Sequence, residues 1–138
     1  MVYKVHYFEN LGGRVEFTKV LLEYGKIPYE MVNIPAAEWP KLKSTYPEGH
    51  VPVLEYEGKF LTQSLSIAQY FAKKLNLLGK NDWEEAQAYS FVLSIEDTIS
   101  ALKPNSRIMK IVKGETTPEE EEEATKILDK ATKTQDIF

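Results

Sequence analysis

The residues best suited to bind a ligand lie between positions 50 and 70. Pro52 opens an apolar run and cannot donate to a strand ladder, so a turn or a cis bond before it should leave the backbone of Val51 free. Gln63 and Ser64 then place an amide and a hydroxyl where a helix is predicted to begin. Together with unpaired helix N–H groups, they could bind a small carboxylate or phosphate. An ordinary hairpin followed by an ordinary helix cap is the alternative interpretation.

The composition limits the chemistry that the protein itself can supply. The chain has 138 residues with a hydrophobic content of 43%, which is enough to fold around a buried core. It contains no cysteine, which excludes disulfides, thiolate metal sites and a thiol nucleophile. Any sulfur chemistry at this site must therefore come from a ligand.

Charge and hydropathy narrow the classes of partner. The net charge of −4 disfavours nucleic acid, because a phosphate backbone attracts a basic surface. No apolar stretch approaches the length of a membrane span, and the first residues lack the pattern of a signal peptide. We therefore expect a cytoplasmic protein that binds neither nucleic acid nor membrane. The glutamates at 119–123 are interpreted as a solvated helix entry, and no metal site is expected.

The first half of the chain predicts strands and helices that share one mixed sheet. The first three elements form a parallel β-α-β unit, whose helix should end with Gly25 in the left-handed conformation. A hairpin that turns at Glu57-Gly58 adds two antiparallel strands. The predicted elements are strand 2–8, helix 14–24, strand 27–34, connector 35–46, strand 52–56, strand 59–61 and a helix from 65.

The second half contains helix signals and no strand signal. We expect a first domain of residues 1–78 and a second, partial all-helical domain of residues 82–138. Asp82 to Glu85 has the form of a capping box, and the helix that it opens should end at Pro104. Thr117-Pro118 opens another helix. Its apolar side chains should form a buried stripe, at positions 124, 127, 128 and 131.

Four short motifs occur in order along the first domain: Tyr7-Phe8, Glu38-Trp39-Pro40-x-Leu42-Lys43, Gly49-x-Val51-Pro52-Val53-Leu54-Glu55 and Gln63-Ser64-x-Ser66-Ile67-Ala68. With the predicted β-α-β, connector, β-β-α order, they resemble the sigma class of glutathione transferases, which includes prostaglandin D synthases and S-crystallins. The similarity is dense over residues 2–97. It implies an α/β thioredoxin-like N-terminal domain with a mixed four-stranded sheet, followed by a partial all-α C-terminal domain.

The resemblance implies a catalytic role for Tyr7, whose hydroxyl would donate a hydrogen bond to the sulfur of glutathione. A free thiol has a pKa of about 8.5, and lowering it by ~2 units corresponds to roughly 2.7 kcal/mol. One hydrogen bond to a charged group contributes about 1.5–3 kcal/mol, so a single hydroxyl could supply most of that shift. The alternative is that Tyr7 is only a core aromatic residue.

The resemblance also implies which residues hold the rest of glutathione, the expected co-substrate. Val51 would pair its backbone with the cysteinyl part, and Gln63 and Ser64 would bind the γ-glutamyl carboxylate. Trp39 and Lys43 would contact the glycyl end, although Trp39 could simply pack and Lys43 could be solvated. The implied set also contains Phe8, Arg14, Gly49, His50, Pro52 and Asp97.

Two of these charged residues have roles of their own in the resemblance. Arg14 would support the tyrosine and the bound sulfur. Asp97, on the long helix from 82, would reach the γ-glutamyl amine of a neighbouring subunit. The resemblance therefore implies a homodimer.

The chain departs from the family pattern in two places. The loop of residues 9–13 has one extra residue and lacks an arginine that usually precedes the position of Arg14. The family's helices continue beyond the position of Phe138, so we expect an abbreviated C-terminal domain and a less complete electrophile pocket. The expected activity is conjugation of glutathione to electrophiles. The alternatives are a non-catalytic protein similar to S-crystallins and a glutathione-dependent prostaglandin isomerase.

Overall fold

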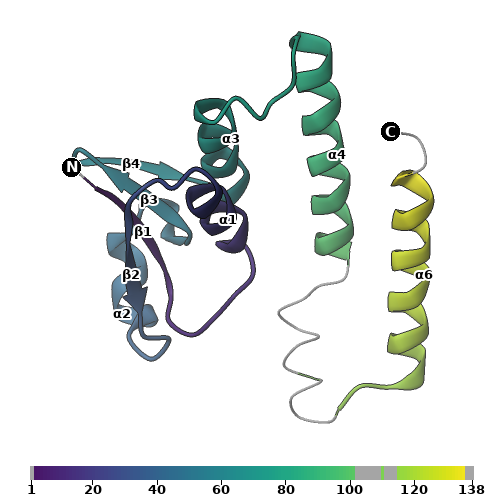
Figure 1. Ribbon diagram of the computed structural model, residues 1–138. Helices are drawn as coiled ribbons and strands as arrows, with labels where there is room; N and C mark the ends of the chain where they lie inside the picture. Colours follow the sequence, from purple (N-terminus) through teal and green to yellow (C-terminus); the bar gives the residue numbers. More distant parts are fainter. Residues whose placement is uncertain (1, 102–109, 111–114, 136–138) are drawn as a thin grey trace. The chain divides into compact units, whose positions relative to one another are not determined.

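The chain forms two units, Met1–Leu78 and Gly79–Phe138, shown in Figure 1. The computed structural model describes residues 2–101, 110 and 115–135, with side chains described as far as residue 130 in the last of these ranges. Within these residues, no helix combines the length and apolar character that crossing a membrane requires.

A four-stranded sheet organises the first unit. Its strands are β1 (Tyr3–Phe8), β2 (Tyr29–Ile34), β3 (Val53–Tyr56) and β4 (Lys59–Thr62), in the order β2-β1-β3-β4. β1 runs parallel to β2 and antiparallel to β3, and β3 pairs antiparallel with β4. The predicted mixed sheet is therefore confirmed, with strand limits that differ from the prediction by one or two residues.

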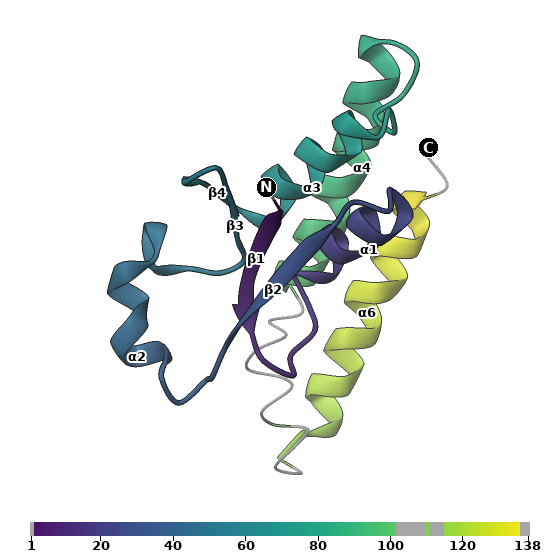
Figure 2. The same ribbon diagram turned by 60° about the vertical axis from the view of Figure 1, so that its left-hand side comes forward.

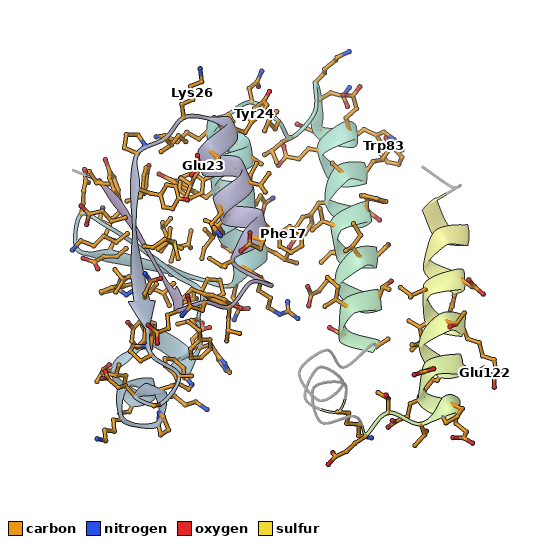
Figure 3. The ribbon with its side chains drawn as sticks, turned by 60° about the horizontal axis from the view of Figure 1, so that its bottom comes forward. Phe17, Glu23, Tyr24, Lys26, Trp83 and Glu122 are labelled. Atoms are coloured by element: carbon orange, nitrogen blue, oxygen red, sulfur yellow. The ribbon has the colours of Figure 1, made fainter. Side chains whose placement is uncertain are left out.

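The core lies between one face of the sheet and two helices, α1 (Glu16–Tyr24) and α3 (Ser64–Lys74). Because side chains alternate along a strand, Tyr3 and Val5 face these helices, where they are buried. They pack with apolar side chains from both helices, including Leu22, Ile67 and Phe71. The exposed Phe17 projects from α1 away from the strands, as Figure 3 shows.

Gly25 follows α1 for a different reason from the one predicted. Its φ is −77°, and the left-handed residue is Lys26 with a φ of 50°, so the predicted C-terminal conformation of Gly25 is wrong. A Cβ at Gly25 would lie 2.5 Å from Cδ2 of Leu75. Close packing between the ends of α1 and α3 therefore explains the glycine at this position.

The connector leads from β2 to the opposite side of the sheet. It contains helix α2 (Trp39–Leu42) and two 3₁₀ turns, η1 (Lys43–Thr45) and η2 (Pro47–Gly49). Figure 2 shows α2 on one side of the strands and both α1 and α3 on the other. The well-packed core thus lies on the α1 and α3 side of the sheet, and the connector lies on the other.

The second unit contains α4 (Asp82–Ala101) and α6 (Pro118–Gln135), which contact each other. The predicted capping box at Asp82 is wrong. The cap of α4 is Asn81, whose side chain accepts hydrogen bonds from the N–H groups of Trp83 and Glu84. The predicted helix start at Thr117-Pro118 is confirmed, and a capping box forms there, since Thr117 and Glu120 bond to each other's backbone N–H groups. The predicted end at Pro104 lies outside the described residues.

The predicted buried stripe of α6 is less buried than expected. Ala124 and Ile127 are half-buried, and Leu128 is 50% exposed. The side chain at position 131 lies outside the described residues. α4 likewise has no buried side chain.

Candidate functional site

The strand register brings the predicted ligand-binding residues of the first unit to one end of the sheet. His6 of β1 pairs with Val53 of β3, and Val53 pairs with Thr62 of β4. The end of β1, the segment before β3 and the segment after β4 are therefore neighbours. Phe8 is also paired with Ile34, so the connector leaves β2 at this same end.

Tyr7 lies at this end of β1, with its ring partly buried against the core cluster. Its hydroxyl donates to the backbone carbonyl of Gly12, with an O···O distance of 3.4 Å. Burial raises the pKa of the Tyr7 hydroxyl, while a hydrogen bond from the backbone of Arg14 and the Arg14 charge oppose that rise. The hydroxyl therefore keeps its proton at neutral pH and can donate a hydrogen bond to a ligand.

The loop that follows β1 folds closely over this hydroxyl. Gly13 has a φ of +111°, a conformation that favours glycine, and a Cβ there would lie 3.5 Å from the Tyr7 oxygen. The longer loop of residues 9–13 therefore still brings Arg14 beside Tyr7. The side chain of Arg14 is exposed.

The sequence left open whether a turn or a cis bond precedes Pro52 at the start of β3. The Val51–Pro52 peptide bond is cis, and Pro52 is buried. Val51 lies outside the strand ladder, which begins at Val53. Val51, which is partly exposed, is thus placed at the end of the sheet beside Tyr7 and Phe8.

Gln63 and Ser64 mark the start of α3, as predicted, but they form no side-chain cap. Gln63 is the N-cap residue, and its side chain makes no capping hydrogen bond. Its Nε2 instead donates to Oε2 of Glu48, at 2.8 Å, which connects it to η2. Ser64 is the first helical residue and is buried. The alternative interpretation, an ordinary side-chain cap at this helix, is therefore wrong.

The backbone of Gln63 has an unusual conformation. Its φ is 68°, in the region that residues other than glycine rarely adopt. Such conformations cost of order 1–3 kcal/mol and are often found at ligand sites. The first N–H groups of α3 have no partners within the helix, as at any helix start, and N–H groups of this kind can bind an anion.

Trp39, Lys43 and Gly49 come together on the connector side of the sheet. The ring of Trp39 meets that of Phe8 edge-on, with centroids 5.1 Å apart. A Cβ at Gly49 would lie 3.3 Å from Cε of Lys43, so the stem of Lys43 passes directly over this glycine. His50 follows and is exposed.

Asp97 belongs to the second unit, where it is an exposed residue of α4. The other predicted site residues, from Tyr7 to Ser64, all belong to the first unit. Among all described residues, no three or more His, Asp or Glu side chains are gathered in a way that could hold a metal ion.

The sequence did not indicate a role for three residues near this site, His6, Tyr46 and Glu55. His6 is buried on the connector side of β1, and its ring nitrogens contact Tyr46 and Glu55. The strand alternation places His6 opposite the core, which was the available signal. Its burial could not be predicted, because the covering Tyr46 comes from a segment without a clear periodic pattern.

Comparisons with known proteins agree with this geometry. The pattern of the family "Glutathione S-transferase, N-terminal domain" matches residues 3–73. Hematopoietic prostaglandin D synthase of Rattus norvegicus is 44% identical over 98 residues, which are 71% of this chain and 49% of that protein. A glutathione S-transferase of Anopheles gambiae is 41% identical over 95 residues, 69% of this chain and 46% of that protein. The chain thus spans about half the length of the curated relatives it matches.

Solved structures give the same result. A crystal structure of a nematode-specific glutathione S-transferase of Caenorhabditis elegans superposes with a TM-score of 0.80 and 32% identity. The match covers 94% of this chain and 63% of that one. From the match over residues 3–73 and the thioredoxin-like arrangement of the sheet, we conclude that the chain belongs to the glutathione S-transferase N-terminal domain family.

Proposed function

We propose that this chain binds glutathione and activates its thiol for attack on small electrophiles. The observation that carries the proposal is the convergence of Tyr7, Val51 and Gln63 at one end of the sheet. A protonated hydroxyl, an unpaired backbone segment and a helix N-terminus together match the thiol, the peptide backbone and the α-carboxylate of this tripeptide.

Each part of the ligand has a partner of suitable chemistry. The Tyr7 hydroxyl donates to the sulfur and favours its thiolate, and the Arg14 charge beside it acts in the same direction. The backbone of Val51 pairs with the cysteinyl residue, and Gln63 and Ser64 hold the γ-glutamyl carboxylate at the start of α3. The glycyl carboxylate lies at the connector, near the residues Phe8, Trp39, Lys43, Gly49, His50 and Pro52.

Several finer assignments belong to the same proposal. The four motifs favour the sigma class, and from that resemblance we also infer a cytoplasmic location and a homodimer. In such a dimer Asp97 reaches the γ-glutamyl amine bound by the partner subunit. The first unit is then the glutathione-binding domain, and the helical unit contributes to the electrophile site.

One specific observation favours a second candidate function. The rat relative is named a prostaglandin D synthase, and it is 44% identical over the region that holds the proposed site. A glutathione-dependent prostaglandin isomerase would use the same thiolate on an endoperoxide. A non-catalytic protein that only binds glutathione is the third candidate.

The test begins with binding and continues with a variant of Tyr7. Calorimetry with glutathione should give binding in the millimolar range or tighter, and the absence of heat at millimolar ligand would contradict the proposal. Tyr7→Phe should lower kcat/KM with an aryl halide by roughly 10- to 150-fold, because it removes one hydrogen bond to a thiolate. Tyr24→Phe, at a tyrosine that is 68% exposed on α1, is the matched control and should leave kcat/KM unchanged.

The same assay separates the candidate functions. Turnover of a prostaglandin endoperoxide without conjugation of the aryl halide would replace the transferase by the isomerase. Binding of glutathione without turnover of either substrate would leave the non-catalytic function.

A further inference from the structure

His6 lies on the face of β1 that is opposite the core, yet it is only 9% exposed. Its Nε2 lies 3.0 Å from Oε2 of Glu55, and its Nδ1 lies 3.1 Å from the hydroxyl oxygen of Tyr46. Both ring nitrogens therefore have partners. We refer to Glu55, His6 and Tyr46 as the histidine triplet.

The strand register explains how the first two members meet. Lys4 and Glu55 are direct cross-strand partners, and His6 is two residues further along β1 on the same face. A diagonal pair of this kind is within reach of long side chains. Nζ of Lys4 also lies 3.5 Å from Oε1 of Glu55, so both oxygens of this carboxylate have partners.

The chemistry of the triplet fixes the direction of its hydrogen bonds. The hydrogen bond from His6 lowers the pKa of Glu55, so the carboxylate is ionised at neutral pH and only accepts. In a neutral imidazole the proton is therefore on Nε2, and Nδ1 accepts from the hydroxyl of Tyr46. Burial raises the pKa of Tyr46, which keeps that hydroxyl protonated as a donor.

Tyr46 connects this triplet to the glycyl side of the proposed site. Its backbone N–H donates to the carbonyl of Lys43 at 3.3 Å, and its carbonyl accepts from Gly49 at 3.0 Å. Its ring lies 5.5 Å from that of Trp39, which in turn meets Phe8. Tyr46 thus contacts, through its backbone or ring, three of the residues assigned to this end of the ligand: Trp39, Lys43 and Gly49.

The connector has a particular need for such an anchor. It consists of one short helix and two 3₁₀ turns, and it has no strand pairing of its own with the sheet. Among its contacts with the rest of the unit are His6 with Tyr46, Phe8 with Trp39, and Gln63 with Glu48. The first of these joins a buried residue of the central strand β1 to the middle of the connector.

We propose that His6 and Tyr46 are positioning residues: the triplet holds the connector so that Trp39 and Lys43 meet the glycyl carboxylate of glutathione. This inference rests on the proposed function, and it adds residues that act through others and do not touch the ligand. The sulfur end of the ligand is held by Tyr7, on the other face of β1, so the triplet acts on affinity for one end of the tripeptide only.

A comparison of two ligands tests this. Glutathione carries the glycyl residue, and γ-glutamylcysteine lacks it while keeping the thiol and the γ-glutamyl group. Tyr46→Phe should raise the Kd for glutathione roughly 3- to 10-fold, the size expected for one lost neutral hydrogen bond. It should change the Kd for γ-glutamylcysteine by less than about twofold, and kcat at saturating glutathione should stay unchanged while KM rises.

Matched variants complete the design. Tyr29→Phe removes a hydroxyl that bonds to Glu23 outside this site, and it should change neither Kd. Lys43→Ala should give the same ligand-selective loss as Tyr46→Phe. His6→Leu should reproduce the loss and His6→Gln, whose amide can both donate and accept, should restore part of it. Should His6→Leu fail to fold, Tyr46→Phe and His6→Gln still carry the test.

The possible outcomes separate this inference from the function on which it rests. If Tyr46→Phe weakens both ligands equally, or weakens neither, the inference is overturned while the proposed function stands. If the unmodified chain binds neither glutathione nor γ-glutamylcysteine, both are overturned.

Discussion

Leu22 and Leu128 are the same residue type in the two units of this chain, and their surroundings differ completely. Leu22 of α1 is fully buried, between the sheet and α3, whereas Leu128 of α6 is 50% exposed. The first unit encloses a set of side chains with no exposed surface, including Val5, Ile67 and Phe71. In the second unit, α4 has no buried side chain.

The helices of the second unit are stabilised by contacts between residues that are close in the sequence. Asn81 caps α4, Thr117 and Glu120 form a capping box at α6, and Glu122 pairs with Lys126 one turn later. Such interactions involve residues three or four apart, and each contributes from a few tenths to about 1 kcal/mol. Packing between residues that are distant in the sequence therefore specifies the first unit. Contacts between residues that are close in the sequence specify the described helices of the second.

The largest expected effect comes from shortening the two leucines. Leu22→Ala should lower the free energy of unfolding by about 2–5 kcal/mol, because it leaves a cavity in a filled core. Leu128→Ala should change it by about 0.5 kcal/mol or less, as at other surface positions. Urea denaturation followed by far-ultraviolet circular dichroism measures both. Equal losses at the two positions would contradict the comparison.

The close approach of α1 and α3 gives the next largest effect. Gly25→Ala should cost about 1–3 kcal/mol, because the new methyl group overlaps Leu75. Gly58→Ala is the contrasting control: its φ of +71° is unfavourable for alanine, unlike the φ of −77° at Gly25, but nothing lies within 4 Å of the added Cβ. Only the Gly25→Ala loss should be relieved by a second change, Leu75→Ala, and a double-mutant cycle measures that coupling. Purely additive losses would show that packing is not the cause.

The helix cap of α4 tests the second unit separately. Asn81→Ala should lower helix stability by about 0.5–2 kcal/mol, because the N–H groups of Trp83 and Glu84 lose their acceptor. Asn81→Ser keeps a capping oxygen and should lose much less. Far-ultraviolet circular dichroism reports the helix.

The fluorescence of Trp39 reports the first unit in the same experiment. The exposed Trp83, labelled in Figure 3, is replaced by phenylalanine so that Trp39 is the only tryptophan. The urea midpoint from Trp39 should not move in Asn81→Ala. A matching shift in both signals would mean that the two units unfold together.

The smallest expected effect depends on pH and belongs to the first unit. The His6 hydrogen bond holds the pKa of Glu55 below its ordinary value of 4.5 in the folded protein. The ionised carboxylate therefore stabilises the fold above that pH, and this contribution is lost as the pH falls through the lowered pKa. The unfolding midpoints of wild type and Glu55→Gln should differ at neutral pH and converge as the pH falls through the lowered pKa of Glu55. A difference that grows on acidification would reverse the assigned direction.

Much of the first unit could be predicted from local patterns. Alternation of side chains predicted β1, and the turn residues Glu57-Gly58 predicted the hairpin. Pro52 predicted a turn or a cis bond at the start of β3, and the structure has a cis bond. The failures are equally informative. Gly25 resembled a helix-ending glycine, but its small size serves a contact with Leu75, fifty positions away, which no local pattern contains.

The sequence by itself determined the elements and the residue types at their ends, because strand alternation, helix caps and proline geometry depend on residues a few positions apart. It also supplied the motifs that resemble the glutathione S-transferase family, which contain Tyr7, Trp39, Lys43 and Gln63. Only the tertiary structure decided which ends meet and that His6 is buried between Tyr46 and Glu55. Those partners are 40 and 49 positions away, and their contact exists only once the strands have paired and the connector covers the sheet.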